Sequence, residues 1–121
     1  MENQVKKGHR GEAAACAFLI EQGFRILQRN WRYKRAEVDI IATEGETLVF
    51  IEVKARKTEA FGPPEAFVSP RKQHMLASAA SAFCAETGHT GELRFDVAAV
   101  LLSDKDGHVT LIRDAFFPGL T

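Results

Sequence analysis

The chain has 121 residues, a length typical of one domain with one hydrophobic core, and we expect residues 1–121 to form a single domain. Apolar residues make up 45% and charged residues 26% of the sequence, which excludes disordered, collagen-like and low-complexity proteins. Sixteen Lys and Arg offset sixteen Asp and Glu, so no net positive charge draws the chain toward nucleic acid or a membrane. No apolar run approaches the roughly 20 residues of a membrane helix. Residues 1–10 are too polar for a signal peptide, so we expect a cytoplasmic protein.

The charge is unevenly distributed along the chain. Residues 1–72 contain 13 basic and 10 acidic residues, whereas residues 73–121 contain 3 basic and 6 acidic residues. Basic residues cluster between positions 25 and 35 and again between positions 54 and 57. Such clusters are usually solvated surface. The uneven distribution nevertheless predicts a molecule with a basic and an acidic side.

The first half of the chain predicts a helix followed by three strands. Apolar side chains recur at helical spacing over residues 11–22, and Gly23 supplies the left-handed residue that ends the helix. Three strands are expected next: one at 24–34, where aromatic and basic residues alternate near the end, and two rich in β-branched residues at 38–43 and 48–53. The last two strands are joined by Gly45-Glu46, and glycine at the first loop position suits a type II′ hairpin turn.

The second half predicts a helix followed by two strands. Ser69 is a good N-cap, Pro70 suits the first helical position, and Gly88 can end the helix after about residue 86. The helix has one apolar stripe, formed by Leu76, Ala79, Ala80 and Phe83. The strands are expected at 93–102 and 109–116, with loops at 61–64 and 103–107. Because a helix between the third and fourth strands permits a parallel crossover, we expect an α/β fold: a mixed β-sheet flanked by helices, in the order αβββαββ.

Charged side chains stand at the end of the predicted hairpin far from its turn, where a buried hairpin would stay apolar: Glu37, Asp39, Glu52 and Lys54. A two-residue loop pairs positions whose numbers sum to 91, so Asp39 is expected opposite Glu52, and Glu37 opposite Lys54. The other face is then wholly apolar, formed by Val38, Ile40, Ala42, Val49, Ile51 and Val53. Carboxylates about 5 Å apart repel by roughly 3 kcal/mol at an effective dielectric near 20. A stable fold therefore needs a reason to keep them.

A hard divalent cation would supply that reason, because Mg²⁺ binds one or two carboxylates and completes its shell with water and phosphate oxygens. Lys54 could then orient the attacking water or stabilise charge on the phosphate. Glu12, in the first turn of the predicted helix, could be a further ligand, although a negative charge there also suits the helix dipole. Alternatively, the strands leave the core at this end, the charges are solvated, and Lys54 pairs with Glu37.

This arrangement resembles the PD-(D/E)xK nuclease superfamily: Asp39, twelve further residues, then Glu52-Val53-Lys54, with Glu12 in a preceding helix. More narrowly, nearly the whole chain resembles the YraN-like family of small bacterial proteins, which are regarded as distant relatives of archaeal Holliday junction resolvases. The match is carried by residues 11–12, 30–32, 37–42, 48–56, 61–62, 71–73 and 94–97. The chain departs from the pattern at Val38, where proline is common, and at Ala36, where glycine is expected.

The resemblance implies a restriction-endonuclease-like three-layer core and one nuclease-like domain. It implies an endonuclease dependent on Mg²⁺ or Mn²⁺ that hydrolyses nucleic-acid phosphodiester bonds, with branched or damaged DNA favoured over RNA. Asp39 and Glu52, together with Glu12, would hold the metal; Lys54 would be the catalytic lysine, and Gln73 would complete the catalytic set. Junction-resolving relatives act as symmetric dimers, so a homodimer is also implied. The rival hypotheses are a noncatalytic nucleic-acid-binding module of the same fold, and a structural adaptor whose charges form an ion-pair network.

Six basic residues form the predicted nucleic-acid-binding surface: Arg32, Lys34, Arg35, Arg56, Arg71 and Lys72. Arg32 and Lys34 alternate with two aromatic residues, Trp31 and Tyr33, which could stack on unpaired bases. The same alternation is explained if the aromatic rings lie in the core. The basic pair at 71–72 falls in the first turn of the second predicted helix, a place suited to phosphate.

The remaining reactive residues predict no separate site. Cys16 and Cys84 lack the spacing of a zinc site, and the four histidines lack metal-ligand spacing, so a zinc hydrolase has little support. Both cysteines are expected to be small buried side chains. Asp96 lies in an apolar strand, and we interpret it as a structural ion-pair residue in preference to a residue that supports the metal site.

Overall fold

The structure is a computed structural model that describes residues 4–57, 68–102 and 107–116. Its elements are α1 (Gln4–Glu21), β1 (Arg25–Tyr33), β2 (Ala36–Glu44), β3 (Thr47–Arg56), α2 (Pro70–Thr87), β4 (Leu93–Leu101) and β5 (His108–Ile112). The predicted order αβββαββ is confirmed. The first helix begins earlier than predicted, and the last strand ends at Ile112 instead of residue 116. The predicted loops at 61–64 and 103–106 lie outside the described residues.

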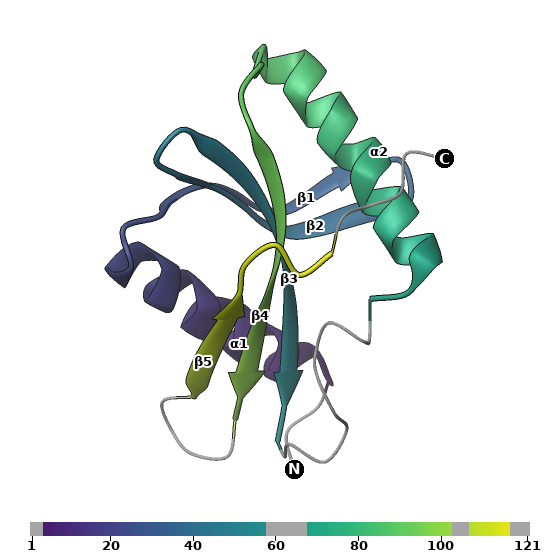
Figure 1. Cartoon of the computed structure of the whole chain (residues 1–121). Coiled ribbons are helices and arrows are strands. Elements are labelled where there is room, and N and C mark those ends of the chain that lie inside the picture. The colour runs from purple at the N-terminus through teal and green to yellow at the C-terminus, as the bar shows by residue number, and fades with distance from the viewer. Residues whose placement is uncertain (1–3, 58–67, 103–106, 117–121) are drawn as a thin grey trace.

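The five strands form one mixed sheet in the order β1-β2-β3-β4-β5. Strands β3 and β4 are parallel and all other neighbours are antiparallel, because α2 carries the chain back between them. The two helices cover opposite faces of the sheet (Figure 1). The fold is therefore the three-layer α/β arrangement that the sequence predicted. Among the described residues, neither helix has the length and apolarity needed to cross a membrane.

The second helix begins, ends and packs as predicted. The Ser69 side chain accepts a hydrogen bond from the Lys72 backbone N–H at 3.1 Å, and Gly88 ends the helix with a φ of 74°. All four residues of its predicted apolar stripe are buried against the sheet.

The aromatic residues of β1 belong to the layer beneath α2. Trp31 packs edge-on against Phe83 with ring centroids 5.2 Å apart, and Tyr33 stacks on Trp31 at 6.3 Å. Both are half-buried against the α2 side of the core, whereas Arg32 and Lys34 are exposed. The core explanation of the alternation in this strand is confirmed.

The hairpin has the predicted register near its turn but not at its far end. Its paired positions run from Glu44 and Thr47 to Ile40 and Ile51, where the ladder ends. Only Gly45 of the two-residue loop has a positive φ, 61°, as a type II′ turn requires. The charged residues therefore lie beyond the last pair of the ladder.

The prediction for Val38 was wrong. Ile40 is buried on the α1 side of the sheet as expected, but Val38 is buried on the α2 side. Strict alternation would place both on one face, so the pleat shifts by one residue at Asp39. The residue of β1 between the partners of Val38 and Ile40 is Asn30, whose φ of 53° interrupts regular pairing there. Local backbone irregularity of this kind leaves no mark in the hydrophobic pattern.

Asp96 forms the structural ion pair that the sequence favoured. It is fully buried, accepts two hydrogen bonds from the Arg94 guanidinium at 2.8 and 2.9 Å, and accepts a third from the Asp114 backbone N–H at 2.9 Å. Arg94 also donates to Glu44 at 2.7 Å, and Arg113 binds the other carboxylate oxygen of Glu44. These bonds from Arg113 and Arg94 hold the pKa of Glu44 at about 2. The network ties β2, β4 and the end of β5 together near the hairpin turn.

Gly11 lets α1 approach β3 closely. A Cβ at this position would lie 2.7 Å from the Ala55 Cβ, whereas a Cβ at Gly8 would meet nothing within 4 Å. We expect Gly11→Ala to lower the free energy of unfolding by about 1 to 3 kcal/mol, because an overpacked contact must shift the helix. Gly8→Ala is the matched control and should be stabilising by roughly 0.5 to 1 kcal/mol through helix propensity. Urea denaturation of the two variants measures this, and an equal response would contradict it.

Candidate active site

Four of the five predicted catalytic residues line one cleft: Glu12, Asp39, Glu52 and Lys54. The cleft has a volume of about 460 Å³ and lies between α1 and the ends of β2 and β3 beyond the hairpin ladder. Its remaining lining residues are Gly8, Val53, Ala55 and Arg56. The four catalytic candidates, which come from three elements and are separated by up to 42 positions in the sequence, thus converge on one cavity.

The backbone at the end of the ladder fixes the position of Asp39. Its Oδ2 accepts a hydrogen bond from the Val53 backbone N–H at 2.8 Å. The last regular pair of the ladder is Ile40 with Ile51, so no strand pairing with β2 serves the Val53 N–H. The Asp39 carboxylate accepts this N–H in place of a backbone carbonyl of β2. Asp39 is consequently held beside Glu52 without being its ladder partner.

Glu52 is the most buried acid of the cleft, with 5% of its surface exposed. Its Oε1 binds the Lys72 ammonium at 3.0 Å, which is an ion pair from β3 to the first turn of α2. Among the described residues, neither Oε2 of Glu52 nor Oε1 of Glu12 has a hydrogen-bond partner, and both atoms are buried. Buried acceptors without donors are costly, so the cleft holds two oxygens that lack a positive partner.

The electrostatics of the cleft show the same excess of negative charge. Burial, the charge of Glu52 and a hydrogen bond with Glu52 raise the pKa of Asp39 to about 8. The Val53 N–H opposes this rise, and the charge of Glu12 adds to it. A raised pKa means that Asp39 keeps its proton near neutral pH unless a cation replaces it.

The residues present fit a magnesium-type ion held by two carboxylates. Within the described part of the chain, no three acidic, histidine or cysteine side chains are close enough together to ligate one ion directly. Asp39 and Glu52 are adjacent, and Mg²⁺ needs only one or two carboxylates because it keeps several water molecules. Glu12, predicted as a ligand, would then act on the ion through water or through its charge.

Lys54 and Glu37 do not pair in the way that the solvated alternative predicted. Glu37 binds Arg32 of the neighbouring strand at 3.0 Å. For residues 4–57, 68–102 and 107–116, the structure shows no ion pair of Lys54, which lines the cleft. Its ammonium is therefore available to a ligand in the cavity.

Of the two polar residues at the start of α2 that could complete the site, Lys72 contacts it and Gln73 does not. Gln73 donates a hydrogen bond to the Val68 carbonyl at 2.9 Å and is not among the residues that line the cleft. Lys72, also predicted to bind nucleic acid, contacts the catalytic candidate Glu52. The Ser69 N-cap signal places Lys72 in the first turn of α2, but the sequence could not show that this turn faces the end of β3.

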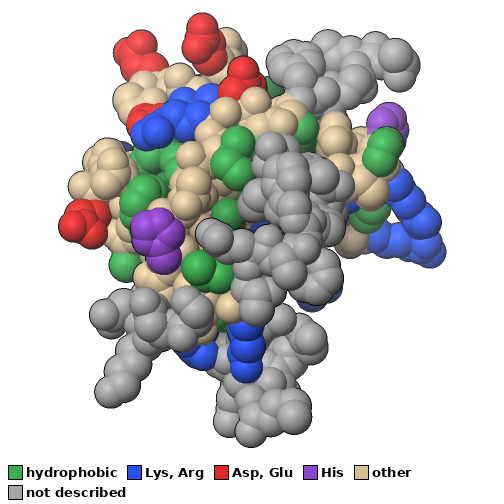
Figure 2. Space-filling model, turned by 60° about the horizontal axis from the view of Figure 1, so that its bottom comes forward, with side chains coloured by type: hydrophobic (Ala, Val, Ile, Leu, Met, Phe, Trp, Pro, Cys, Tyr) green, Lys and Arg blue, Asp and Glu red, His purple; other side chains and the backbone are tan. Residues whose placement is uncertain are grey.

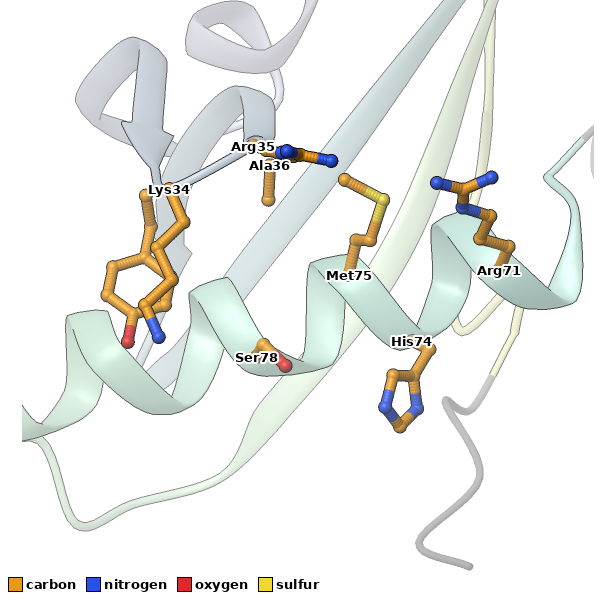
Figure 3. A pocket seen from close by; sticks show the side chains of 8 residues that line it. Lys34, Arg35, Ala36, Arg71, His74, Met75 and Ser78 are labelled. Atoms are coloured by element: carbon orange, nitrogen blue, oxygen red, sulfur yellow. The ribbon is translucent and has the colours of Figure 1, made fainter.

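The other predicted nucleic-acid-binding residues fall into three places. Arg56 lines the cleft, and Arg32 is exposed and paired with Glu37. Lys34, Arg35 and Arg71 line a hollow between the β1–β2 turn and α2 (Figure 3). On the face drawn in Figure 2, acidic side chains gather toward the top, where a group of Lys and Arg side chains lies among them, and further Lys and Arg side chains lie at the right and lower edges. The separation of charge on this face is therefore incomplete.

The fold and the cleft define a small three-layer α/β domain with a carboxylate-rich site at the open end of a β-hairpin. The chain belongs to the family described as uncharacterised protein family UPF0102, whose family model matches residues 11–100. This confirms the resemblance to the YraN-like family.

Several curated members of this family are similar to nearly the whole chain. A UPF0102 protein of Desulforapulum autotrophicum is 47% identical over 118 residues, which covers 96% of this chain and 98% of the relative. A UPF0102 protein of Syntrophus aciditrophicus is 42% identical over 118 residues, covering 96% and 92%. One from Christiangramia forsetii is 40% identical over 117 residues, covering 97% and 98%. The chain therefore spans almost the full length of these relatives.

Proposed function

We propose that this protein is a metal-dependent endonuclease that hydrolyses phosphodiester bonds in nucleic acid, with branched or damaged DNA as the favoured substrate. The observation that carries the proposal is the convergence of Asp39, Glu52 and Lys54 in one cleft, with two buried carboxylate oxygens left without a donor. Cationic side chains border this cleft from β3 and α2. An ion-pair network serving stability alone would not leave these oxygens unpaired.

Each residue of the cleft has a role that its contacts support. Asp39 and Glu52 would hold Mg²⁺ or Mn²⁺, which when bound supplies Lewis acidity toward phosphate and water. The Val53 N–H orients the Asp39 carboxylate, and Lys72 holds Glu52 in place. Lys54 offers an ammonium group that can orient the attacking water or stabilise the negative charge that develops on the phosphate. Water then adds to phosphorus, the P–O ester bond breaks, and the leaving oxygen takes up a proton.

The proposal is tested by incubating the protein with branched, single-stranded and duplex DNA in Mg²⁺ or Mn²⁺. We expect cleavage that EDTA abolishes and that Glu52→Gln or Lys54→Ala lowers by roughly 10²- to 10³-fold, the usual effect of removing one charge-stabilising group. Glu46→Gln is the matched control, because this acid is exposed in the hairpin loop at the other end of the strands and should leave cleavage unchanged.

Two outcomes would contradict this function. Cleavage that persists in Glu52→Gln and Lys54→Ala would exclude the proposed site. Salt-sensitive binding of DNA without cleavage under any cation would instead support a noncatalytic nucleic-acid-binding module. Cutting both strands of a branched substrate would need two clefts, so the mass of the active species shows whether the homodimer forms.

A further inference from the structure

A second concave surface lies beside the cleft, between the β1–β2 turn and the first turns of α2. It consists of two adjoining hollows of about 540 and 300 Å³ that share four lining residues: Arg35, Ala36, Arg71 and Met75. We call this surface the cationic groove and define it by Tyr33, Lys34, Arg35, Arg71, Lys72 and Met75. The larger hollow is within the range of sites that hold small organic groups.

The groove has basic walls and an apolar floor. Figure 3 shows Met75 rising from α2 between the guanidinium groups of Arg35, from the β1–β2 turn, and Arg71, from the helix. Lys34 lies beside Tyr33, with its ammonium 5.3 Å from the ring centroid. Among the described residues that line the groove, Glu37 is the single acid.

That acid does not neutralise the groove. Glu37 is already bound to Arg32, which lies outside the groove, at 3.0 Å. Arg35 and Arg71 are both exposed, and no ion pair is recorded for either within the described ranges. The groove therefore keeps the positive charge of its walls and complements an anion.

The groove and the proposed catalytic cleft are linked by one ion pair. Lys72 lines the smaller hollow, and its ammonium binds Glu52, which lines the cleft. A ligand in the smaller hollow would therefore contact the residue that holds Glu52.

We propose that the cationic groove binds a single-stranded segment of nucleic acid, with phosphates on Arg35 and Arg71 and one unpaired base in the larger hollow against Met75 and Tyr33. A duplex presents phosphates outward and keeps its bases stacked inside, so it would leave the apolar floor unfilled. A splayed base has a flat face that can stack on an aromatic ring such as that of Tyr33 and make apolar contact with Met75. That the segment continues into the cleft rests on the proposed nuclease function; its binding does not.

The binding is measured by fluorescence anisotropy of the intact protein in EDTA, with labelled oligo-dT, oligo-rU and a blunt DNA duplex. We expect Arg71→Ala and Arg35→Ala to weaken single-strand binding about tenfold and to reduce the slope of log K against log salt by about 0.7 each. Met75→Ala should weaken it by a similar factor through lost apolar contact with the base, without changing the salt slope. Arg25→Ala, an exposed arginine of β1 outside the groove, is the control and should have no effect.

The binding experiment tests the groove proposal independently of the proposed nuclease function. Unchanged oligo-dT and oligo-rU binding in the three groove variants, or an equal loss of duplex binding, would overturn the groove assignment even if the protein cleaves DNA. Loss of single-strand binding in these variants would support it even if no cation induces cleavage, in which case the proposed nuclease function alone fails.

Discussion

Replacing Asp39 with asparagine is expected to stabilise the protein while it abolishes cleavage of nucleic acid. The amide oxygen can still accept the Val53 N–H, and the amide nitrogen can donate to Glu52, so the local hydrogen bonds survive. What disappears is the cost of burying the Asp39 carboxylate and its repulsion by Glu52, the two main causes of the raised pKa of Asp39. We expect the free energy of unfolding in EDTA at pH 8 to rise by about 1 to 3 kcal/mol and cleavage to fall by roughly 10²- to 10³-fold.

The stabilisation should depend on pH with a defined sign. The folded-state pKa of Asp39 is about 8, well above the ordinary value of 3.8, so the native state keeps a proton that the unfolded chain releases. Stability from this group is complete below about pH 4 and is lost as pH rises toward 8, because the unfolded state binds fewer protons in that window. The difference between Asp39→Asn and wild type should therefore grow from pH 4 to pH 8 and level off above it.

Urea unfolding of both proteins in EDTA across this range provides the measurement. Glu46→Gln, an exposed acid in the hairpin loop, should show no such difference at any pH. A stability gain that is independent of pH, or a loss of stability in Asp39→Asn, would mean that the carboxyl groups of the cleft do not repel one another in the folded protein. A gain in stability joined to a loss of function is typical of residues kept for chemistry.

Removing the Asp96 carboxylate should have the opposite effect on stability. This fully buried group accepts hydrogen bonds from Arg94 and from the Asp114 N–H. Asp96→Ala would leave a largely buried guanidinium with Glu44 as its remaining partner, together with an unpaired backbone donor. Breaking a buried pair from one side costs about 3 to 5 kcal/mol. We expect a loss of this size in denaturant unfolding.

Two further variants complete the test of Asp96: one is a control for stability, and the other distinguishes a structural from a catalytic role. Glu92→Ala, at an exposed position just before β4, should change stability by less than about 0.5 kcal/mol. Asp96→Asn keeps part of the hydrogen bonding and should fold well enough at low temperature for assay. Because Asp96 binds Arg94 near the hairpin turn and is absent from the cleft, cleavage per folded molecule should match that of the wild type. A specific loss of cleavage would assign it to the active site.

Much of the candidate site could be predicted because strand alternation and a two-residue turn are short-range rules. The register sum of 91 holds from Glu44 with Thr47 to Ile40 with Ile51, and it brings Asp39 and Glu52 to the same end of the hairpin. The ladder ends at that pair, and beyond it the Asp39 carboxylate, instead of a backbone carbonyl, accepts the Val53 N–H. Sequence periodicity carries no information about the backbone of a strand that pairs from elsewhere in the chain.

The contacts of the second helix could not be predicted in the same way. Its cap, its apolar stripe and its end follow from local residue chemistry at Ser69 and Gly88. That its first turn brings Lys72 to Glu52, and Arg71 beside Arg35, depends on how the crossover after β3 returns across the sheet. Gln73 fits the family pattern in sequence, yet its side chain is used to hold Val68.

The near-even total of charges conceals an arrangement that only three dimensions reveal. The sequence by itself determined the order of elements, the hairpin register near its turn, the apolar stripe of α2 and the residue types of an acidic site, because each depends on neighbours a few positions apart. The tertiary structure decided that Glu12 joins the cleft, that Asp39 is held by Val53, and that Lys72 connects the cleft to a basic groove. These contacts join segments that are distant in sequence. Their geometry is set by the packing of the helices on the sheet, which no local sequence pattern encodes.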